Sequence, residues 1–266
     1  MRIVTYNRFG LFHLKEFSRN EVFSAIKNAF FTMDEYLHPS TDYKINSRQD
    51  ISYILGSSVP VGDCFYERST VLVELKPNIE ETFKQFPSTT KNEINQILKM
   101  NAGAFTMDSN PSKMKITAFK TVFKDFAKVI GMDGLDENYL TSLQRSGALY
   151  ISDITDESGN ILIFHVYRVS QDRPELLHSY RNVFIGQKQY ISKVNRYCHW
   201  LDMCHFAKAG FTTYDFGGFY KGDDEKHLNI NKFKLSFGGN VTVLFNSILY
   251  NSRKAKLFKK IKGSGV

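Results

Sequence analysis

Apolar and polar positions along this chain follow two periods, one typical of helices and one typical of strands. The residues Phe119, Phe123 and Phe126 recur at helical spacing, and Gly131 follows them as a helix terminator. Short apolar runs bounded by turn residues predict strands, and the turn 156–159 joins two of them as a hairpin. The pattern as a whole predicts helices over 21–36, 80–86, 91–100, 117–130, 137–146, 194–209 and 231–236, and strands over 70–75, 148–154, 160–169, 175–180, 212–216 and 241–249.

The order of these elements indicates a mixed α/β fold. A hairpin, a third strand, a long helix and another strand follow one another between 148 and 216. A helix that joins two neighbouring strands of one sheet brings the chain back in parallel. We therefore expect a sheet with parallel and antiparallel pairs and with helices on both faces.

The pattern changes at Ser69 and again near the end of the chain. It predicts an N-terminal partial domain (1–69), a main domain (70–250) and a basic C-terminal tail (251–266). The first of these holds the expected helix 21–36, followed by a stretch over 39–60 that is predicted to be rich in turns.

Composition excludes several classes of protein. The chain has 266 residues, of which 42% are hydrophobic and 23% charged, so most of it is expected to fold around a core. No long uncharged apolar run and no signal-peptide pattern occur, and we expect a cytoplasmic protein without a membrane span. Three cysteines without a C-x-x-C pair cannot form a disulfide framework.

The net charge of +8 points to an anionic partner, such as a nucleotide, a nucleic acid or a membrane surface. Six of the basic residues lie within 253–262, which we interpret as a solvated tail. Without this tail the chain is only mildly basic. A broad basic face for DNA is therefore not expected.

The cluster Cys198, His199, Cys204 and His205 has the residue types of a metal site but not the spacing. Cys198 and Cys204 point in different directions on a helix, and no second pair of ligands follows. We expect no metal here, and we expect the thiols to be inert because their neighbourhood is apolar.

A phosphate site is the next candidate, although no Walker loop and no G-x-G-x-x-G occurs. If a helix begins at Val194, Ser192 and Lys193 precede it and Asn195 and Arg196 lie in its first turn, and together they could seat a pyrophosphate. Ordinary helix capping is the alternative explanation of these residues.

Two glycine-rich motifs, YDFGG (214–218) and FKLSFGG (233–239), carry a carboxylate and a lysine. Asp215 ends a predicted strand beside two glycines, which would place it at a sheet edge open to a ligand. Lys234 lies among aromatic residues, so its ammonium is expected to face an anion. The alternative is that Asp215 caps a turn and that Lys234 only extends its apolar stem over the core.

Three segments, KNEINQILKMN (91–101), NRYCHWLDMCHFAKAGFTTYDFGG (195–218) and INKFKLSFGG (230–239), resemble the Fem-type branch of the GNAT acyltransferase superfamily. The resemblance spans about 70–250. It implies a GNAT fold, in which two central strands separate and an activated donor lies in the gap. The superfamily's Q/R-x-x-G-x-G/A loop is missing, and only Arg181 and Gly186 resemble part of it.

The resemblance also implies roles for particular residues. Ser179, Tyr180 and Arg181 would bind the arm of acyl-CoA, with Ser192, Asn195 and Arg196 at its pyrophosphate. Tyr214, Gly217, Gly218 and Phe233 would line the substrate site. The catalytic candidates are Lys234, which would stabilise negative charge, and Asp215 as base, with His178 as a rival base because an ordinary histidine titrates near neutral pH.

The function that we expect is transfer of an acyl group from acyl-CoA to the amine of a small acceptor. A nucleotide-linked amino sugar used for bacterial surface polysaccharide fits the modest positive charge. One alternative is an aminoacyl-tRNA-dependent, Fem-type transferase of peptidoglycan bridges. A second alternative is a GNAT-fold binding module without catalysis.

Overall fold

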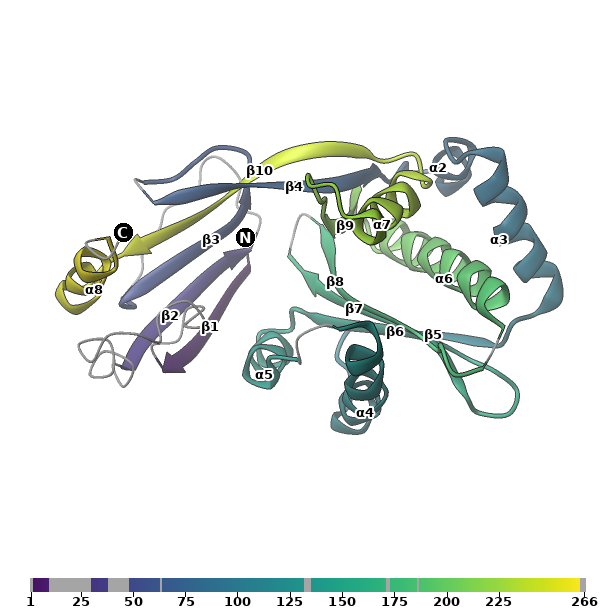
Figure 1. Cartoon of the computed structure of the whole chain (residues 1–266), viewed down its shortest axis with the longest axis horizontal. Helices are drawn as coiled ribbons and strands as arrows, with labels where there is room; N and C mark the ends of the chain where they lie inside the picture. The colour runs from purple at the N-terminus through teal and green to yellow at the C-terminus, as the bar shows by residue number, and fades with distance from the viewer. Residues whose placement is uncertain are drawn as a thin grey trace. The chain divides into compact units, whose positions relative to one another are not determined.

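The computed structural model describes residues 2–9, 30–37, 48–62, 64–131, 135–170, 173–185 and 187–263 (Figure 1). The chain forms two compact units. The larger comprises Ser69–Val243, and the smaller comprises Met1–Arg68 together with Leu244–Val266. The strands β4 (Phe65–Glu74) and β10 (Asn240–Tyr250) each have residues in both units.

In the larger unit the strands follow the order β10-β4-β9-β8-β7-β6-β5. The pair β8–β9 is parallel, whereas β4–β9, β7–β8, β6–β7 and β5–β6 are antiparallel. The predicted mixed sheet is therefore confirmed. The remaining elements of this unit are α2 (Ile79–Lys84), α3 (Ser88–Met100), β5 (Ala104–Asp108), α4 (Lys113–Ile130), α5 (Glu137–Arg145), β6 (Leu149–Thr155), β7 (Ile161–Val169), β8 (Pro174–Arg181), α6 (Lys188–Lys208), β9 (Thr213–Gly218) and α7 (Glu225–Leu235).

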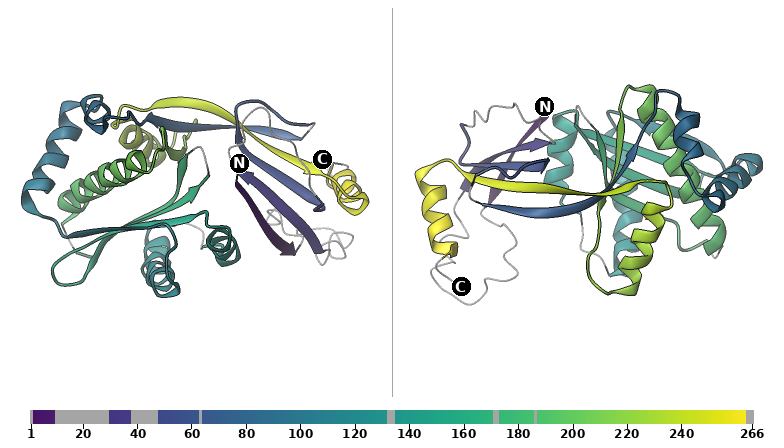
Figure 2. Two further views of the ribbon diagram at one scale, coloured as in Figure 1. Left: turned by 180° about the vertical axis from the view of Figure 1, so that it is seen from behind. Right: turned by 90° about the horizontal axis from the view of Figure 1, so that it is seen from above.

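Helices cover both faces of this sheet, as predicted. The helix α6 lies against one face, and α4 and α5 lie against the other (Figures 1 and 2). Val194 and Cys198 of α6 pack in one apolar cluster with Ile163 of β7. On the opposite face, Phe126 of α4 meets the ring of Tyr180 of β8 with 5.3 Å between ring centroids.

The ends of α4 follow from local chemistry, but the start of α6 differs from its prediction. The hydroxyl of Ser112 accepts a hydrogen bond from the Lys115 amide at 3.2 Å, and Gly131 ends α4 with φ of 69°.

Helix α6 begins at Lys188 rather than near Val194. The buried side chain of Ile191 extends the apolar stripe of α6 by a full turn beyond the predicted start.

The smaller unit contains β1 (Arg2–Phe9), β2 (Phe30–Leu37), β3 (Ile51–Ser57) and α8 (Arg253–Gly263), with its strands in the order β1-β2-β3-β10-β4. The helix predicted over 21–36 is wrong for 30–36, which lie in β2 between two strand partners. Residues 21–29, the rest of that prediction, lie outside the described residues. The stretch predicted to be rich in turns contains β3, whose pairing with β2 and β10 outweighs the turn-forming residues.

The C-terminal segment is a helix and not a solvated tail. Ala255 is fully buried, and Phe258 packs with Ile51 and Ile248. Packing of this apolar face on the sheet stabilises the helix. In the sequence, the apolar residues are interspersed with lysines, so the helical pattern was not recognised. None of the helices among the described residues is long and apolar enough to cross a membrane.

Candidate active site between two strands

The strands β8 and β9 pair at one position and then separate. Their register contains the single pair Glu175–Asp215, whereas β8 continues to Arg181 and β9 to Gly218. Leu177 is an extra residue in the register between β7 and β8, which is a bulge. A gap therefore opens between the carboxyl-terminal halves of β8 and β9, in the part of the sheet seen beside α6 in Figure 1.

Backbone amides of β8 point into this gap. The Asn182 amide donates to the Leu162 carbonyl of β7 at 2.9 Å, and Tyr180 pairs with Phe164 two residues earlier. Amides alternate in direction along a strand, so those of Ser179 and Arg181 point away from β7. In the register between the described residues of β8 and β9, neither of these two amides has a strand partner.

Ion pairs hold the closed end of the gap. Glu175 lies 2.6 Å from Nη2 of Arg168, and Oδ2 of Asp215 lies 3.2 Å from Nε of Arg173. The other oxygen of Asp215 accepts hydrogen bonds from the Thr70 hydroxyl and, at 2.8 Å, from the Gly217 amide. The predicted position of Asp215 at a sheet edge is wrong, because β9 lies between β4 and β8 and the side chain is fully buried.

Lys234 lies at the open end. Its ammonium donates to the Gly218 carbonyl and is 3.5 Å from the Gly217 carbonyl, so α7 holds a partly buried cation at the end of β9. Gly217 and Gly218 are the last two residues of β9, at the end of the strand that the sequence predicts. Gly217 has φ of 72°, a conformation that glycine adopts without strain.

Arg196 and Phe233 join α6 to α7. The Arg196 guanidinium lies 4.8 Å from the ring centroid of Phe233 and donates to the Ser236 hydroxyl at 2.5 Å. It also pairs with Glu93 of α3 at 2.5 Å. Arg196 is thus a link among three helices.

The predicted pyrophosphate seat at the start of α6 is wrong in its geometry. Since α6 begins at Lys188, Ser192, Asn195 and Arg196 lie beyond its first turn and not at its amino terminus. Asn195 is buried with its oxygen hydrogen-bonded within the core, as described below. Gly186, the other expected contact in this region, lies outside the described residues.

His178 and Tyr180 lie on the face of the sheet that α4 covers. The His178 ring packs on Phe119 and Phe123, with centroids 6.2 and 5.1 Å away. Burial lowers its pKa from 6.5 to about 4, which removes the reason for expecting a base that titrates near neutral pH. Tyr180 is also buried, and burial raises its pKa.

A chain of hydrogen bonds between buried side chains was not predicted. Nδ1 of His165 on β7 lies 2.6 Å from Oδ2 of Asp202, and Nε2 lies 3.0 Å from Oδ1 of Asn195. Both ring nitrogens of His165 therefore have an oxygen atom within hydrogen-bonding distance. The Asn195 oxygen is also 3.5 Å from the hydroxyl of Ser179, which connects this network to β8.

The network continues through two tyrosines to a second histidine. The Tyr167 hydroxyl donates to Asp202 at 2.6 Å and lies 2.7 Å from the Tyr214 hydroxyl, which is 2.7 Å from Nδ1 of His199. Tyr214 is therefore a buried member of the core, whereas we expected it to line the substrate site. The pKa of His199 falls well below its ordinary value through burial, then through the charges of His165, Arg196, Lys234 and Arg181.

A sequence signal for this network exists in α6. Asn195, His199 and Asp202 recur at helical spacing on the same helix face as the buried Val194 and Cys198. Three polar residues within an apolar stripe indicate a buried polar cluster, because such groups need partners.

Among the described residues, His165, His199 and Asp202 also have the donor types of a metal site, with ligand atoms within 4.8 Å of one another. Both nitrogens of His165 and Nδ1 of His199 already have hydrogen-bond partners in the network. Burial raises the pKa of Cys198 well above its ordinary value and that of Cys204 to about 12, in agreement with the predicted inert thiols.

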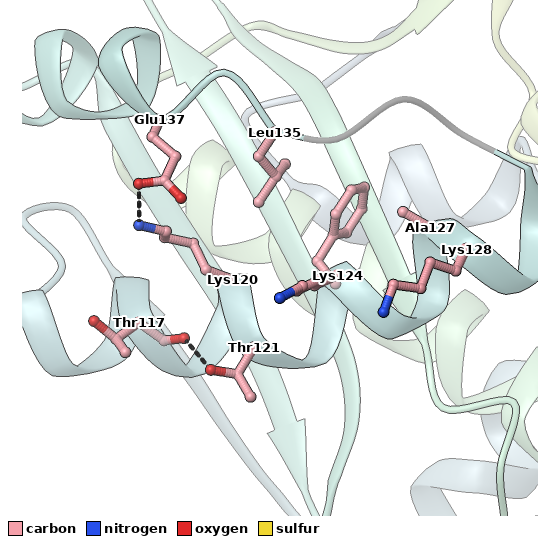
Figure 3. Close-up of a pocket in the computed structure, with 9 residues that line it drawn as sticks. Thr117, Lys120, Thr121, Lys124, Ala127, Lys128, Leu135 and Glu137 are labelled. Carbon is pink, nitrogen blue, oxygen red and sulfur yellow. Dashed lines mark hydrogen bonds and ion pairs between the residues drawn. The ribbon is translucent and has the colours of Figure 1, made fainter.

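A surface cavity of about 500 Å³ lies against α4 and the start of α5 (Figure 3). Lys120, Lys124 and Lys128 line it along one side of α4, and Lys120 pairs with Glu137 at 2.6 Å. Phe123 forms part of its wall and separates it from His178. The cavity is therefore on the α4 face of the sheet, whereas the buried network is on the α6 face.

No protein-family model matches this sequence, and no curated protein matches it. Among solved structures, FemX is similar with a TM-score of 0.61 and 14% identity, over 88% of this chain and 86% of that chain. The C-terminal domain of a putative lysylphosphatidylglycerol synthetase from Agrobacterium fabrum is similar with a TM-score of 0.54 and 12% identity, over 89% of this chain and 85% of that domain. At these identities the likeness is one of fold alone, and it agrees with the predicted GNAT-like fold.

Proposed function

We propose that this chain transfers an acyl or aminoacyl group from an activated carrier to a nucleophile. The observation that supports the proposal is the single register pair between β8 and β9. Beyond this pair the amides of Ser179 and Arg181 have no partner in the register of β8 and β9, and an extended carrier arm could accept hydrogen bonds from them. Ser179 and Arg181 would donate their amides to the carbonyl groups of that arm.

The charges around the gap favour an anionic carrier. Arg181, Arg196 and Lys234 all act electrostatically on His199, which lies in the core beside them. Arg196 is paired with Glu93, so Arg181 and Lys234 would provide most of the attraction. Phosphates of the carrier are the groups that such cations recognise.

The reaction that we propose is direct transfer. A neutral amine attacks the carbonyl carbon of the activated ester or thioester, and a tetrahedral oxyanion forms. A β8 amide or the Lys234 ammonium would stabilise that charge. The bond to the carrier then breaks, the carrier leaves with the bonding electron pair, and the proton lost by the amine balances it. Asp215 is fixed at the closed end of the gap, where it would position β9.

We favour acyl-CoA as the donor, with a small amine as acceptor, of which a nucleotide-linked amino sugar is one candidate. An aminoacyl-tRNA is the second candidate donor. Its phosphates would meet the same two cations, Arg181 and Lys234, beside the gap.

The proposal is tested by measuring thermal stabilisation with CoA, acyl-CoA thioesters and tRNA, followed by an assay of carrier release. A carrier that binds the folded chain raises its melting temperature. Lys234→Ala is expected to lower turnover by roughly a hundredfold, the effect typical of losing one group that stabilises an oxyanion.

Lys232→Ala is the matched control, because Lys232 is an exposed lysine on the same helix. Its turnover should stay within about threefold of the parent chain. Stabilisation by CoA selects the first donor, and stabilisation by tRNA alone selects the second. If no carrier stabilises the chain, the proposal is wrong and a binding module is favoured.

A further inference from the structure

One face of α8 is fixed to the sheet of the smaller unit. Ala255 is fully buried there, and Phe258 packs beside it. Lys254 pairs with Asp50 at 2.7 Å. Burial raises the pKa of Asp50, but hydrogen bonds from Lys254, Ser252 and the Thr32 amide outweigh this and lower the pKa to about 2. The orientation of α8 on its unit is therefore well defined.

The opposite face of α8 is basic and carries one exposed leucine. At about 100° per residue, Arg253, Lys256, Leu257 and Lys260 fall within an arc of about 100°. All four side chains are exposed, and Leu257 is 59% exposed. No hydrogen bond or ion pair joins these three cations to side chains of the described residues.

No acidic residue lies nearby in the sequence to neutralise this face, since none follows Glu225. Lys259 lies at its border, with its ammonium 6.0 Å from the ring centroid of Tyr250. The face therefore carries three exposed cations, with an apolar side chain at its edge.

We infer that this face of α8 docks onto an anionic lipid surface. Basic residues on an interfacial helix are attracted by anionic headgroups, and an apolar side chain beside them can enter the headgroup boundary. A nucleic acid would match the three cations equally well, but its phosphate backbone provides no partner for Leu257. The exposed leucine thus favours lipid, and the inference does not depend on the proposed transfer reaction.

The test is co-sedimentation of the full chain with vesicles of phosphatidylcholine, alone or with about a third of phosphatidylglycerol. We expect binding to the anionic vesicles only, and loss of binding when the salt concentration is raised from about 0.1 M to 1 M. The double variant Lys256→Glu/Lys260→Glu should partition at least about 30-fold more weakly, since each basic residue contributes roughly a fivefold gain. Leu257→Ala should weaken partitioning about fivefold, because less apolar surface enters the boundary.

Lys99→Glu/Lys221→Glu is the control, with the same change in net charge at two exposed lysines of the larger unit. It should bind anionic vesicles within about threefold of the parent chain, because neither lysine belongs to the basic face of α8. If the control variant loses as much vesicle binding as Lys256→Glu/Lys260→Glu, binding depends only on the net charge of the chain and the inference is wrong. Equal binding of the parent chain to neutral and anionic vesicles would also overturn it, because the headgroup charge would then have no effect. If the chain ignores vesicles, or binds an RNA oligonucleotide through Lys256 and Lys260 without an effect of Leu257→Ala, the inference is wrong.

Discussion

At the scale of single residues, His165 and Asp202 form a hydrogen bond in the core. Both side chains are fully buried, and Tyr167 donates a second hydrogen bond to the same oxygen of Asp202. Removing one partner of a buried hydrogen bond leaves the other group unsatisfied, which typically costs about 1–3 kcal/mol. The network is therefore sensitive to small chemical changes.

Asp202→Asn should lower the free energy of unfolding by about 2 kcal/mol, measured by urea denaturation, because the hydrogen bonds from His165 and Tyr167 to the buried carboxylate are disturbed. Asp125→Asn is the control, because Asp125 is exposed and its pair with Lys128 at 3.5 Å is on the surface. The control should change stability by less than about 0.5 kcal/mol. Similar small effects of both variants would show that the hydrogen bonds of Asp202 do not stabilise the core.

His178 makes stability depend on pH in a predictable direction. Its pKa is about 4 in the folded chain and 6.5 without the fold, so the unfolded chain takes up a proton first as the pH falls. The contribution of neutral His178 is therefore complete above pH 6.5 and is lost between pH 6.5 and 4. Between about pH 7 and pH 5 the loss amounts to about 2 kcal/mol.

The free energy of unfolding of His178→Leu should fall less steeply over this pH range by that amount. His205→Gln changes a histidine elsewhere on the fold and should keep the slope of the parent chain. An unchanged slope in His178→Leu would show that His178 is not held neutral by burial.

The sequence predicted individual site residues unevenly. The two glycine-rich motifs singled out in the sequence meet in the structure, where the Lys234 ammonium lies beside the carbonyls of Gly217 and Gly218. The partners of Asp215 and His165 come from distant parts of the chain, such as Thr70 and Asp202. Periodicity within one segment does not reveal such contacts.

At the scale of elements, glycines define where two helices end. Gly131 after α4 and Gly238 after α7 both have positive φ, of 69° and 70°. A Cβ atom at Gly131 would meet nothing within 4 Å, whereas one at Gly238 would lie 2.9 Å from the Gln85 carbonyl oxygen. The two positions thus differ in the space available and not in backbone conformation.

Gly131→Ala should cost about 1–2 kcal/mol of stability through its positive φ alone. Gly238→Ala should cost at least about 1 kcal/mol more, because the backbone of Gln85 must move. Thermal denaturation of both variants provides the comparison. Equal losses of stability in the two variants would show that a Cβ atom at position 238 fits without moving the backbone of Gln85.

Elements with a long apolar stripe were predicted well from the sequence, as α4 and the hairpin β6–β7 illustrate. Short elements were missed, including β5, which is exposed along much of its length and is a strand because it pairs with β6. The strand β2 has apolar residues that also fit a helix, so pairing with β1 and β3 decides its conformation.

At the scale of the whole molecule, the sequence motifs predicted the GNAT-like fold and the separation of two central strands. They could not predict that residues after 243 belong to the same compact unit as the start of the chain. That arrangement depends on β10 pairing with β3, about 190 residues away in sequence.

Residue-resolved amide hydrogen exchange tests whether β8 and β9 separate beyond their single register pair. In the free chain, the amides of Ser179 and Arg181 should exchange on the order of a hundredfold faster than that of Tyr180, which faces β7. A bound acyl-CoA analogue or aminoacyl-tRNA analogue should slow both. Equal, strong protection of all three amides in the free chain would show that β8 and β9 are joined along their length and that no carrier arm can lie between them.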